Sequence, residues 1–206
     1  MVLFGLISGI VVSSIIFSAT GFSIFGRFHE KTAPSGEANF AELSALAYSV
    51  LEHIADRDYA ALSRVAHPEF GVVFSPSATI TLSTNRRFSA ERIAAFGTDN
   101  TVYVWGILNG SGEPIEMTPE EYFAGFIYNR NYASAKAVGI NNIVRSGNAL
   151  ENIRDVFPNI QFLDFHIPGS NGEASEDFEW TSLRIGFEEY EGRLYLTLIS
   201  QSGWSA

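Results

Sequence analysis

The sequence predicts an α+β domain in which N-terminal helices pack on one face of a curved antiparallel sheet. Apolar residues recur at spacings of three and four between Phe40 and Ile54, which is typical of an amphipathic helix. The C-terminal part contains three β-rich segments, 160–167, 181–190 and 193–200. Helices followed by a run of antiparallel strands are typical of the α+β class.

Capping residues predict where further helices begin. A short second helix is expected over 59–65, ended by Pro68, because the residue before a proline avoids the α conformation. Ser89 is expected to cap a brief helix. Thr118 and Glu121 frame a capping box with a proline between them, so another helix should start there and run to about residue 128.

Several extended segments are predicted between and after these helices. Residues 71–74 and 79–82 flank a Ser-Pro-Ser turn and suit a β-hairpin. Residues 101–105 are β-branched and aromatic, which predicts a strand. Glu191-Gly192 is expected to form the tight turn of the last hairpin.

The chain divides into three parts. Residues 1–26 hold no charged side chain, and residues 27–38 mix charges with Pro, Ser and Gly, as a linker would. Residues 39–206 are long enough for one domain with a sizeable core. Within that domain, residues 129–158 show scattered Asn, Gly and Ser, and only 149–156 has a helical pattern.

The apolar leader, residues 1–26, could cross a hydrocarbon core of about 30 Å, which takes roughly 20 helical residues. Two interpretations stay open: an uncleaved membrane anchor and a cleaved signal peptide. The anchor is favoured, because no basic n-region precedes the run and the run is long for a signal peptide. A buried soluble helix is the third and least favoured, since few soluble cores hold a helix that is apolar on every face. Either favoured interpretation predicts an extracytoplasmic protein.

The charge and the cysteine content limit the partners. The formal net charge is −10, and all charged side chains follow residue 26. An acidic surface disfavours nucleic acid and anionic lipid headgroups as partners, because both require basic patches. The sequence has no cysteine, which excludes disulfides and a lipid-modified N-terminal cysteine.

Three segments carry a family resemblance. The helix ending in His53–Leu62, followed by a His-Pro-Glu loop, resembles the opening of NTF2-like domains. The segment Trp180–Leu196 resembles their terminal hairpin, and Trp105–Ile115 is similar to a stretch found in a group of uncharacterised exported bacterial proteins and lipoproteins. The resemblance covers about residues 40–204 and implies a cone-shaped sheet closed on one side by helices. It implies no catalytic residues.

Of the four histidines, His166 is the strongest candidate for acid–base chemistry, because Asp164 lies two residues before it. Side chains alternate along a strand, so Asp164 and His166 share a face about 7 Å apart, where a carboxylate could raise the basicity of the imidazole. Arg184 and Glu188 share a face of the next strand. On a concave face these residues would resemble the polar pockets of NTF2-like enzymes. The favoured alternative is that they form the solvated face of an antiparallel sheet.

No other pattern predicts a cofactor or a metal. The histidines lack zinc-ligand spacing, and the sequence has no P-loop, dinucleotide fingerprint or nucleophile elbow. The acidic stretch within 168–177 lacks the order of an EF-hand and is predicted to be a solvated loop. Trp180 follows this loop and is predicted either to pack in the core or to line the entrance of a ligand pocket. Trp180 and Glu188 are therefore the candidate ligand-binding residues.

Three classes of function remain. A non-catalytic cell-envelope domain that binds a small ligand or a protein partner is favoured, because no catalytic signature is present. The second is an NTF2-like isomerase or hydrolase that uses His166 with Asp164 as base. The third is a structural homo-oligomer assembled through its sheet face. An enclosed pocket that gathers His166, Asp164 and Arg184 would favour the enzyme.

Overall fold

A computed structural model describes residues 36–108, 110–169 and 179–203. The apolar leader, most of the linker and most of the acidic loop lie outside the described residues. Within the ranges that are described, no helix has the length and apolar character needed to cross a membrane. The prediction of an anchor or signal peptide therefore stays a prediction.

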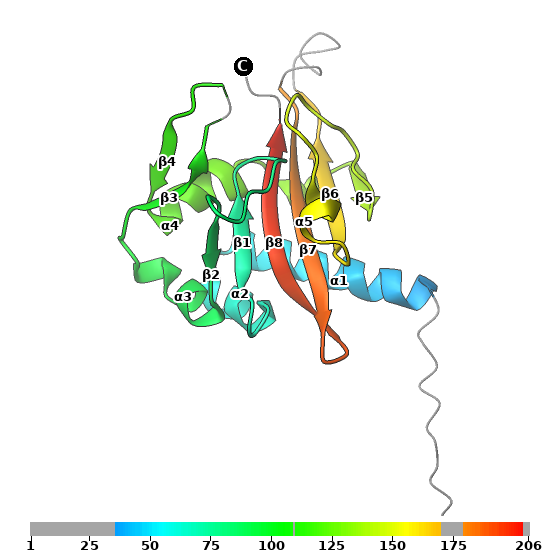
Figure 1. Cartoon of the computed structure of the whole chain (residues 1–206). Helices are drawn as coiled ribbons and strands as arrows, with labels where there is room; N and C mark the ends of the chain where they lie inside the picture. The colour runs from blue at the N-terminus through cyan, green and yellow to red at the C-terminus, as the bar shows by residue number, and fades with distance from the viewer. Residues whose placement is uncertain (1–35, 109, 170–178, 204–206) are drawn as a thin grey trace, which may run out of the picture. The chain divides into compact units, whose positions relative to one another are not determined.

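Six strands form the main sheet, in the order β2-β1-β8-β7-β6-β5 (Figure 1). These strands are β1 (Val72–Ser75), β2 (Arg86–Phe88), β5 (Ala137–Ile140), β6 (Gln161–Ile167), β7 (Thr181–Tyr190) and β8 (Arg193–Gly203). Neighbouring strands are antiparallel except β1 and β8, which are parallel. The prediction of a wholly antiparallel sheet is wrong at this pair. Because β1 and β8 are far apart in the chain, no hairpin constrains their direction.

The last hairpin has the predicted strands and the predicted turn. β7 and β8 pair from Thr181 to Tyr190, and the register shifts by one residue between Gly186 and Phe187. Such a bulge increases the local twist, and both strands bend visibly along their length (Figure 1). Glu191 and Gly192 both have positive φ, as a two-residue turn of type I′ requires.

The first hairpin differs from the prediction in its second strand. β1 pairs with β2 rather than with residues 79–82. The Asn152 side chain accepts a hydrogen bond from the Ile80 N–H (2.8 Å) and donates one to the Ile80 carbonyl (2.9 Å). Because these bonds satisfy a buried residue's backbone, this segment needs no strand partner.

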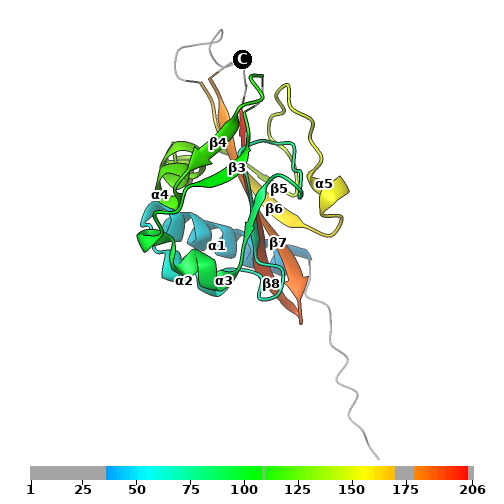
Figure 2. The same cartoon turned by 60° about the vertical axis from the view of Figure 1, so that its left-hand side comes forward.

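Four of the described helices lie on one side of the main sheet: α1 (Gly36–Ala55), α2 (Tyr59–Val65), α3 (Ala90–Ala94) and α4 (Pro119–Tyr122). The fifth, α5 (Ile153–Val156), lies on the other side. The long helix α1 crosses the sheet (Figures 1 and 2). Its apolar stripe, predicted from Phe40, is buried from Leu43 to Ile54 against Leu163, Phe165 and Leu183, whereas Phe40 itself is exposed. Thr118 and Glu121 form the predicted capping box, and a π-helical turn (Phe123–Ile127) extends α4.

A two-stranded sheet closes the end of this core. It consists of β3 (Tyr103–Ile107) and β4 (Pro114–Met117). Trp105 stacks on Tyr122 with 3.9 Å between ring centroids and donates a hydrogen bond from its indole nitrogen to the Met117 carbonyl. The aromatic side chains therefore form the core between the small sheet and the helices.

The opposite face of the main sheet is covered by the chain itself. Residues 141–160, here called the covering segment, connect β5 to β6 and contain α5, which lies on the other side of the sheet from α1 (Figure 2). This second face is called the outer face. At one end of it, a second apolar cluster forms from Val73, Ile80, Ile153, Phe157, Ile160, Phe162 and Leu198. The sequence did not predict that residues 129–158 would cover the sheet, nor that β5 would form there.

The α+β class and the packing of N-terminal helices against a curved sheet are confirmed. The resemblance implied a sheet closed by helices on one side, and the helices on the face of α1 agree with this, but the packing on the opposite face was not implied. The covering segment gives the sheet two packed faces, so it is an open sheet with layers on both sides.

Candidate functional site

A row of polar side chains lies beneath the covering segment on the outer face. Strand register places Asp164 opposite Arg184 and Arg184 opposite Ser200, and in the next row His166 opposite Ser182 and Ser182 opposite Ser202. All six are buried, Asp164 and Arg184 completely. The favoured prediction that this face is solvated is wrong, because the covering segment removes it from water.

Arg184 is the charged centre of this row. Its two terminal nitrogens donate to the two carboxylate oxygens of Glu151, the second at 2.9 Å, in a forked ion pair. Its Nε lies 3.5 Å from Asp164 Oδ2. Two carboxylates therefore compensate one buried guanidinium, one from the sheet and one from the covering segment.

Asp164 is bonded to the covering segment and not to His166. Its Oδ2 accepts a hydrogen bond from the Val144 N–H (2.9 Å), and its Oδ1 is buried without a hydrogen bond. Although Asp164 and His166 share a face as predicted, the carboxylate does not orient the imidazole. The predicted Asp–His pair is thus adjacent but not coupled by a hydrogen bond.

His166 lies at the edge of the buried row. Its Nδ1 is 3.0 Å from Ser182 Oγ, and its ring is 5.6 Å from that of Trp180, centroid to centroid. Arg145 of the covering segment lies over the Trp180 ring, with its guanidinium carbon 5.6 Å from the ring centroid. Burial lowers the pKa of His166, and Arg145 lowers it further, whereas the nearby Asp164 opposes both effects.

The structure separates the two candidate ligand-binding residues. Trp180 is buried beside His166, so these two predicted residues lie together. Glu188 is half-buried opposite Tyr195, four residues along β7 from Arg184. At the rise of a strand this is about 13 Å, so Glu188 is outside the buried row.

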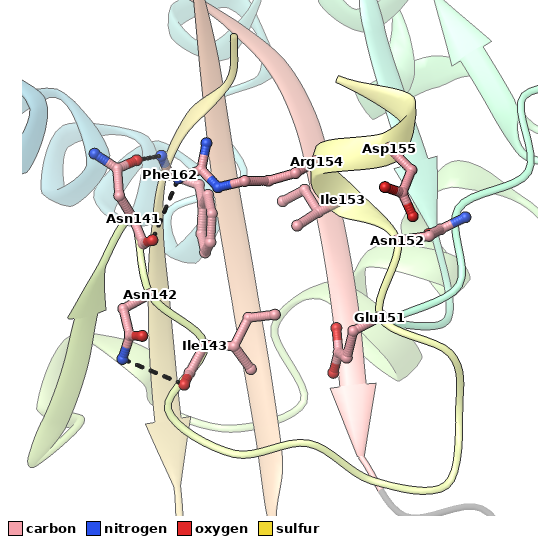
Figure 3. Close-up of a pocket in the computed structure, with 9 residues that line it drawn as sticks. All are labelled: Asn141, Asn142, Ile143, Glu151, Asn152, Ile153, Arg154, Asp155 and Phe162. Atoms are coloured by element: carbon pink, nitrogen blue, oxygen red, sulfur yellow. Dashed lines mark hydrogen bonds between the residues drawn. The ribbon is translucent and has the colours of Figure 1, made fainter. Parts of the chain in front are cut away.

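A pocket opens on the outer face beside the buried row, and is here called the outer-face pocket (Figure 3). Its volume is about 270 Å³. It is lined by Asn141, Asn142, Ile143, Glu151, Asn152, Ile153, Arg154, Asp155 and Phe162. The first three lie on one side and the residues from Glu151 to Asp155 on the other (Figure 3). Glu151 therefore belongs both to the wall of this pocket and to the ion pair with Arg184.

The walls of the outer-face pocket are held by their own hydrogen bonds. Asn141 Oδ1 accepts from the Phe162 N–H (2.9 Å). Arg154 donates to the carbonyls of Ile160 (3.2 Å) and Asn141 (3.3 Å), and its guanidinium carbon lies 5.5 Å from the Phe162 ring centroid. The bond from Arg154 to Asn141 connects the two walls of the pocket, so the shape of the pocket does not depend on a ligand.

Sequence reasoning missed Glu151, which connects the pocket to the buried row. Glu151 and Arg184 are 33 positions apart, and neither strand alternation nor helical spacing relates them. The preceding residues have no periodic pattern that would predict which face they cover. No signal in one sequence could have identified this pair.

Two further pockets lie away from the polar row. One of about 490 Å³ lies beside α1 and includes Tyr48 and Tyr128, and one of about 380 Å³ lies between Arg86 and Ile107. Across the described ranges, no three His, Asp or Glu side chains are grouped as a metal site would require.

Comparison with known proteins identifies no family. No family model matches the chain, and no curated protein matches it. Among solved structures, an NTF-2 like protein of unknown function from Shewanella oneidensis MR-1 aligns with 80% of this chain and 98% of its own, at 10% identity and a TM-score of 0.31.

Proposed function

We propose that this chain is a cell-envelope domain that binds a small ligand in the outer-face pocket without converting it. The apolar leader supports the location, because residues 1–26 could serve as an anchor or a signal peptide. The acidic charge of the rest of the chain supports a ligand other than nucleic acid.

The composition and bonding of the pocket carry the ligand-binding part of the proposal. Its volume of about 270 Å³ suits a small molecule, and its lining combines amide and charged side chains with the ring of Phe162. Asn142 and Asp155 are exposed at its edge, where the Asn142 Oδ1 and the Asp155 carboxylate could orient a polar ligand. Hydrogen bonds fix the surrounding walls, which lowers the entropic cost of binding.

The position of the Asp–His pair is the reason for proposing binding over catalysis. Neither His166 nor Asp164 lines the outer-face pocket. His166 Nδ1 is within hydrogen-bond distance of Ser182, and Asp164 binds Val144 and lies beside Arg184. A base must reach the proton that it removes, and here the covering segment lies over both groups.

Assembly through the sheet face is not included in the proposal. The helix α1 packs on one face of strands β5 to β8, and the covering segment packs on the other. These strands therefore offer no wide apolar face of their own to a second copy.

Ligand binding is tested by filling the pocket. Wild type, Asn142→Phe and the matched control Asn100→Phe would be screened with sugars, amino acids and short organic acids by amide NMR shifts. Asn100 is also exposed but does not line the pocket. We expect one class of probe to shift the amides of Ile143 and Arg154 in wild type and in Asn100→Phe, but not in Asn142→Phe. Absence of saturable shifts with every class at millimolar concentration would contradict the proposal.

Location is tested separately by fractionating cells that express a C-terminally tagged chain. We expect the tag in the membrane fraction, or outside the cytosol at reduced length if the leader is removed. Full-length protein in the soluble cytosolic fraction would contradict the cell-envelope location.

A further inference from the structure

The buried row holds more polar groups than its contacts satisfy. Arg184 Nε, Asp164 Oδ1 and Ser200 Oγ are all buried without a hydrogen bond, and strand register places the three residues side by side. Buried polar atoms are normally bonded, so the contacts within the protein leave this row incompletely paired. The planar guanidinium of Arg184 has the fork geometry that binds a carboxylate through two parallel N–H···O bonds.

Glu151 occupies the anion-binding fork of Arg184. The Arg184 side chain is fully buried, whereas that of Glu151 is 17% exposed and forms part of the pocket wall. Glu151 is next to Leu150, which is 69% exposed, and so belongs to a part of the covering segment with little apolar packing. A rotation of the Glu151 side chain would open Arg184 to the outer-face pocket.

We infer that the ligand of the outer-face pocket carries a carboxylate, and that Glu151 holds the place of this carboxylate on Arg184 when no ligand is bound. The inference rests on the proposed function, because it names the ligand class of the same pocket. An incoming carboxylate would make the same two N–H···O bonds that Glu151 makes, and Glu151 would move into water. A neutral ligand would replace Glu151 poorly, because the buried guanidinium would lose one of its two carboxylate partners and its charge-assisted hydrogen bonds.

The second carboxylate favours a monoanion over a phosphate. Asp164 Oδ2 lies 3.5 Å from Arg184 Nε, so the site already holds one negative charge beside the guanidinium. A dianionic phosphate would be repelled by Asp164 more strongly than a carboxylate with a single charge. Glu151 competes with the ligand in wild type, and its removal should raise the apparent affinity.

The test compares Glu151→Ala and Glu151→Gln with wild type and with Glu188→Ala, which removes a half-buried glutamate from β7 outside the row. Each protein would be titrated with acetate, propionate, acetamide and inorganic phosphate at constant ionic strength. The readouts are the side-chain Nε–H NMR signal of Arg184 and the thermal unfolding temperature. Glu151→Gln keeps the side-chain shape and serves if Glu151→Ala does not fold.

We expect the Glu151 variants to bind acetate or propionate at least tenfold more tightly than wild type or Glu188→Ala, and acetamide not at all. Adding Arg184→Met should abolish this gain. Equal affinity in Glu151 variants and Glu188→Ala, tighter binding of phosphate than of acetate, or a gain that survives Arg184→Met would overturn the inference. If a neutral probe binds wild type and is blocked by Asn142→Phe while the Glu151 variants gain nothing, the inference fails and the proposed function stands.

Discussion

At the scale of single residues, Arg184 determines the electrostatics of the outer face. It is a fully buried cation between the carboxylates of Glu151 and Asp164. Such a group contributes little net stability when paired, because desolvation offsets the attraction, but the loss of one partner leaves a buried charge uncompensated. The contribution of these ion pairs to stability is therefore best measured by removing one partner.

Arg184→Met should destabilise the protein by about 3–5 kcal/mol, because it removes the cation that compensates the buried Asp164 and the largely buried Glu151. Urea denaturation would measure this free energy of unfolding. The double variant Arg184→Met with Glu151→Leu should recover at least half of the loss, since Asp164 keeps its bond to the Val144 N–H. A loss below about 1 kcal/mol for the single variant, the range of exposed pairs, would contradict the buried geometry.

His166 should make stability depend on pH. Burial lowers the pKa of His166 in the folded state below its ordinary value, so near the ordinary histidine range the unfolded chain binds more protons than the folded chain. Stability is therefore expected to fall as the pH drops from about 7.5 to about 5.5, across the ordinary histidine pKa near 6.5. His166→Gln should reduce this slope in urea unfolding, whereas His53→Gln on α1 serves as the control. An unchanged slope in His166→Gln would contradict the assignment.

At the scale of elements, the covering segment has no regular structure over most of its length and is held by a few side-chain bonds. The Asn152 side chain bonds both backbone groups of Ile80, and Arg154 donates to the carbonyls of Asn141 and Ile160 at the two ends of the segment. Side-chain amides here replace the ladder of a strand partner. The predicted helix over 149–156 is realised only as α5, the last four of those residues.

Asn152→Ala should cost about 1–3 kcal/mol, because it leaves a buried N–H and a buried carbonyl of Ile80 without partners. Asn142→Ala is the matched control, since this residue lies in the same segment but is exposed, and its effect should stay within about 0.5 kcal/mol. Chemical denaturation of both variants measures the difference. Equal effects would show that Asn152 does not hold the segment to residues 79–82.

At the scale of the whole molecule, the sheet is a layer between two cores. The helix-side core contains the stripe of α1 and most of the aromatic side chains, and the outer core joins β1, β6 and β8 to the covering segment. The two cores share the same strands, because alternate residues of each strand face opposite sides. Covering both faces explains why a row of charged and hydroxyl residues can be buried in a mainly antiparallel sheet.

Gly186→Ala tests the packing of the covering segment on the outer face of the sheet. A Cβ added at Gly186 would lie 2.4 Å from Ile160 Cδ1, so the variant should lose about 1–3 kcal/mol of stability through overpacking. Shortening the opposing side chain with Ile160→Val should make the double variant less destabilised than the sum of the two changes. Gly125→Ala is the control, because its Cβ would meet nothing within 4 Å. Equal tolerance of alanine at both glycines would argue against close packing of the covering segment on β7.

The sequence by itself determined the parts of this protein that depend on local chemistry. The apolar stripe of α1, the capping box at Thr118 and the Glu191-Gly192 turn were predicted because helical periodicity, capping and positive φ are properties of a few neighbouring residues. Strand alternation also placed Asp164 and His166 on one face. It could not say what covers that face.

Only the tertiary structure decided that the polar row is buried and that Glu151 is the partner of Arg184. The covering segment has no periodic pattern, so its path depends on scattered contacts such as Asn152 with Ile80. Pairings between residues far apart in a chain leave no regular spacing in one sequence. The same polar alternation is therefore compatible with a solvated face or a buried ion pair, and the chain that packs over it makes the choice.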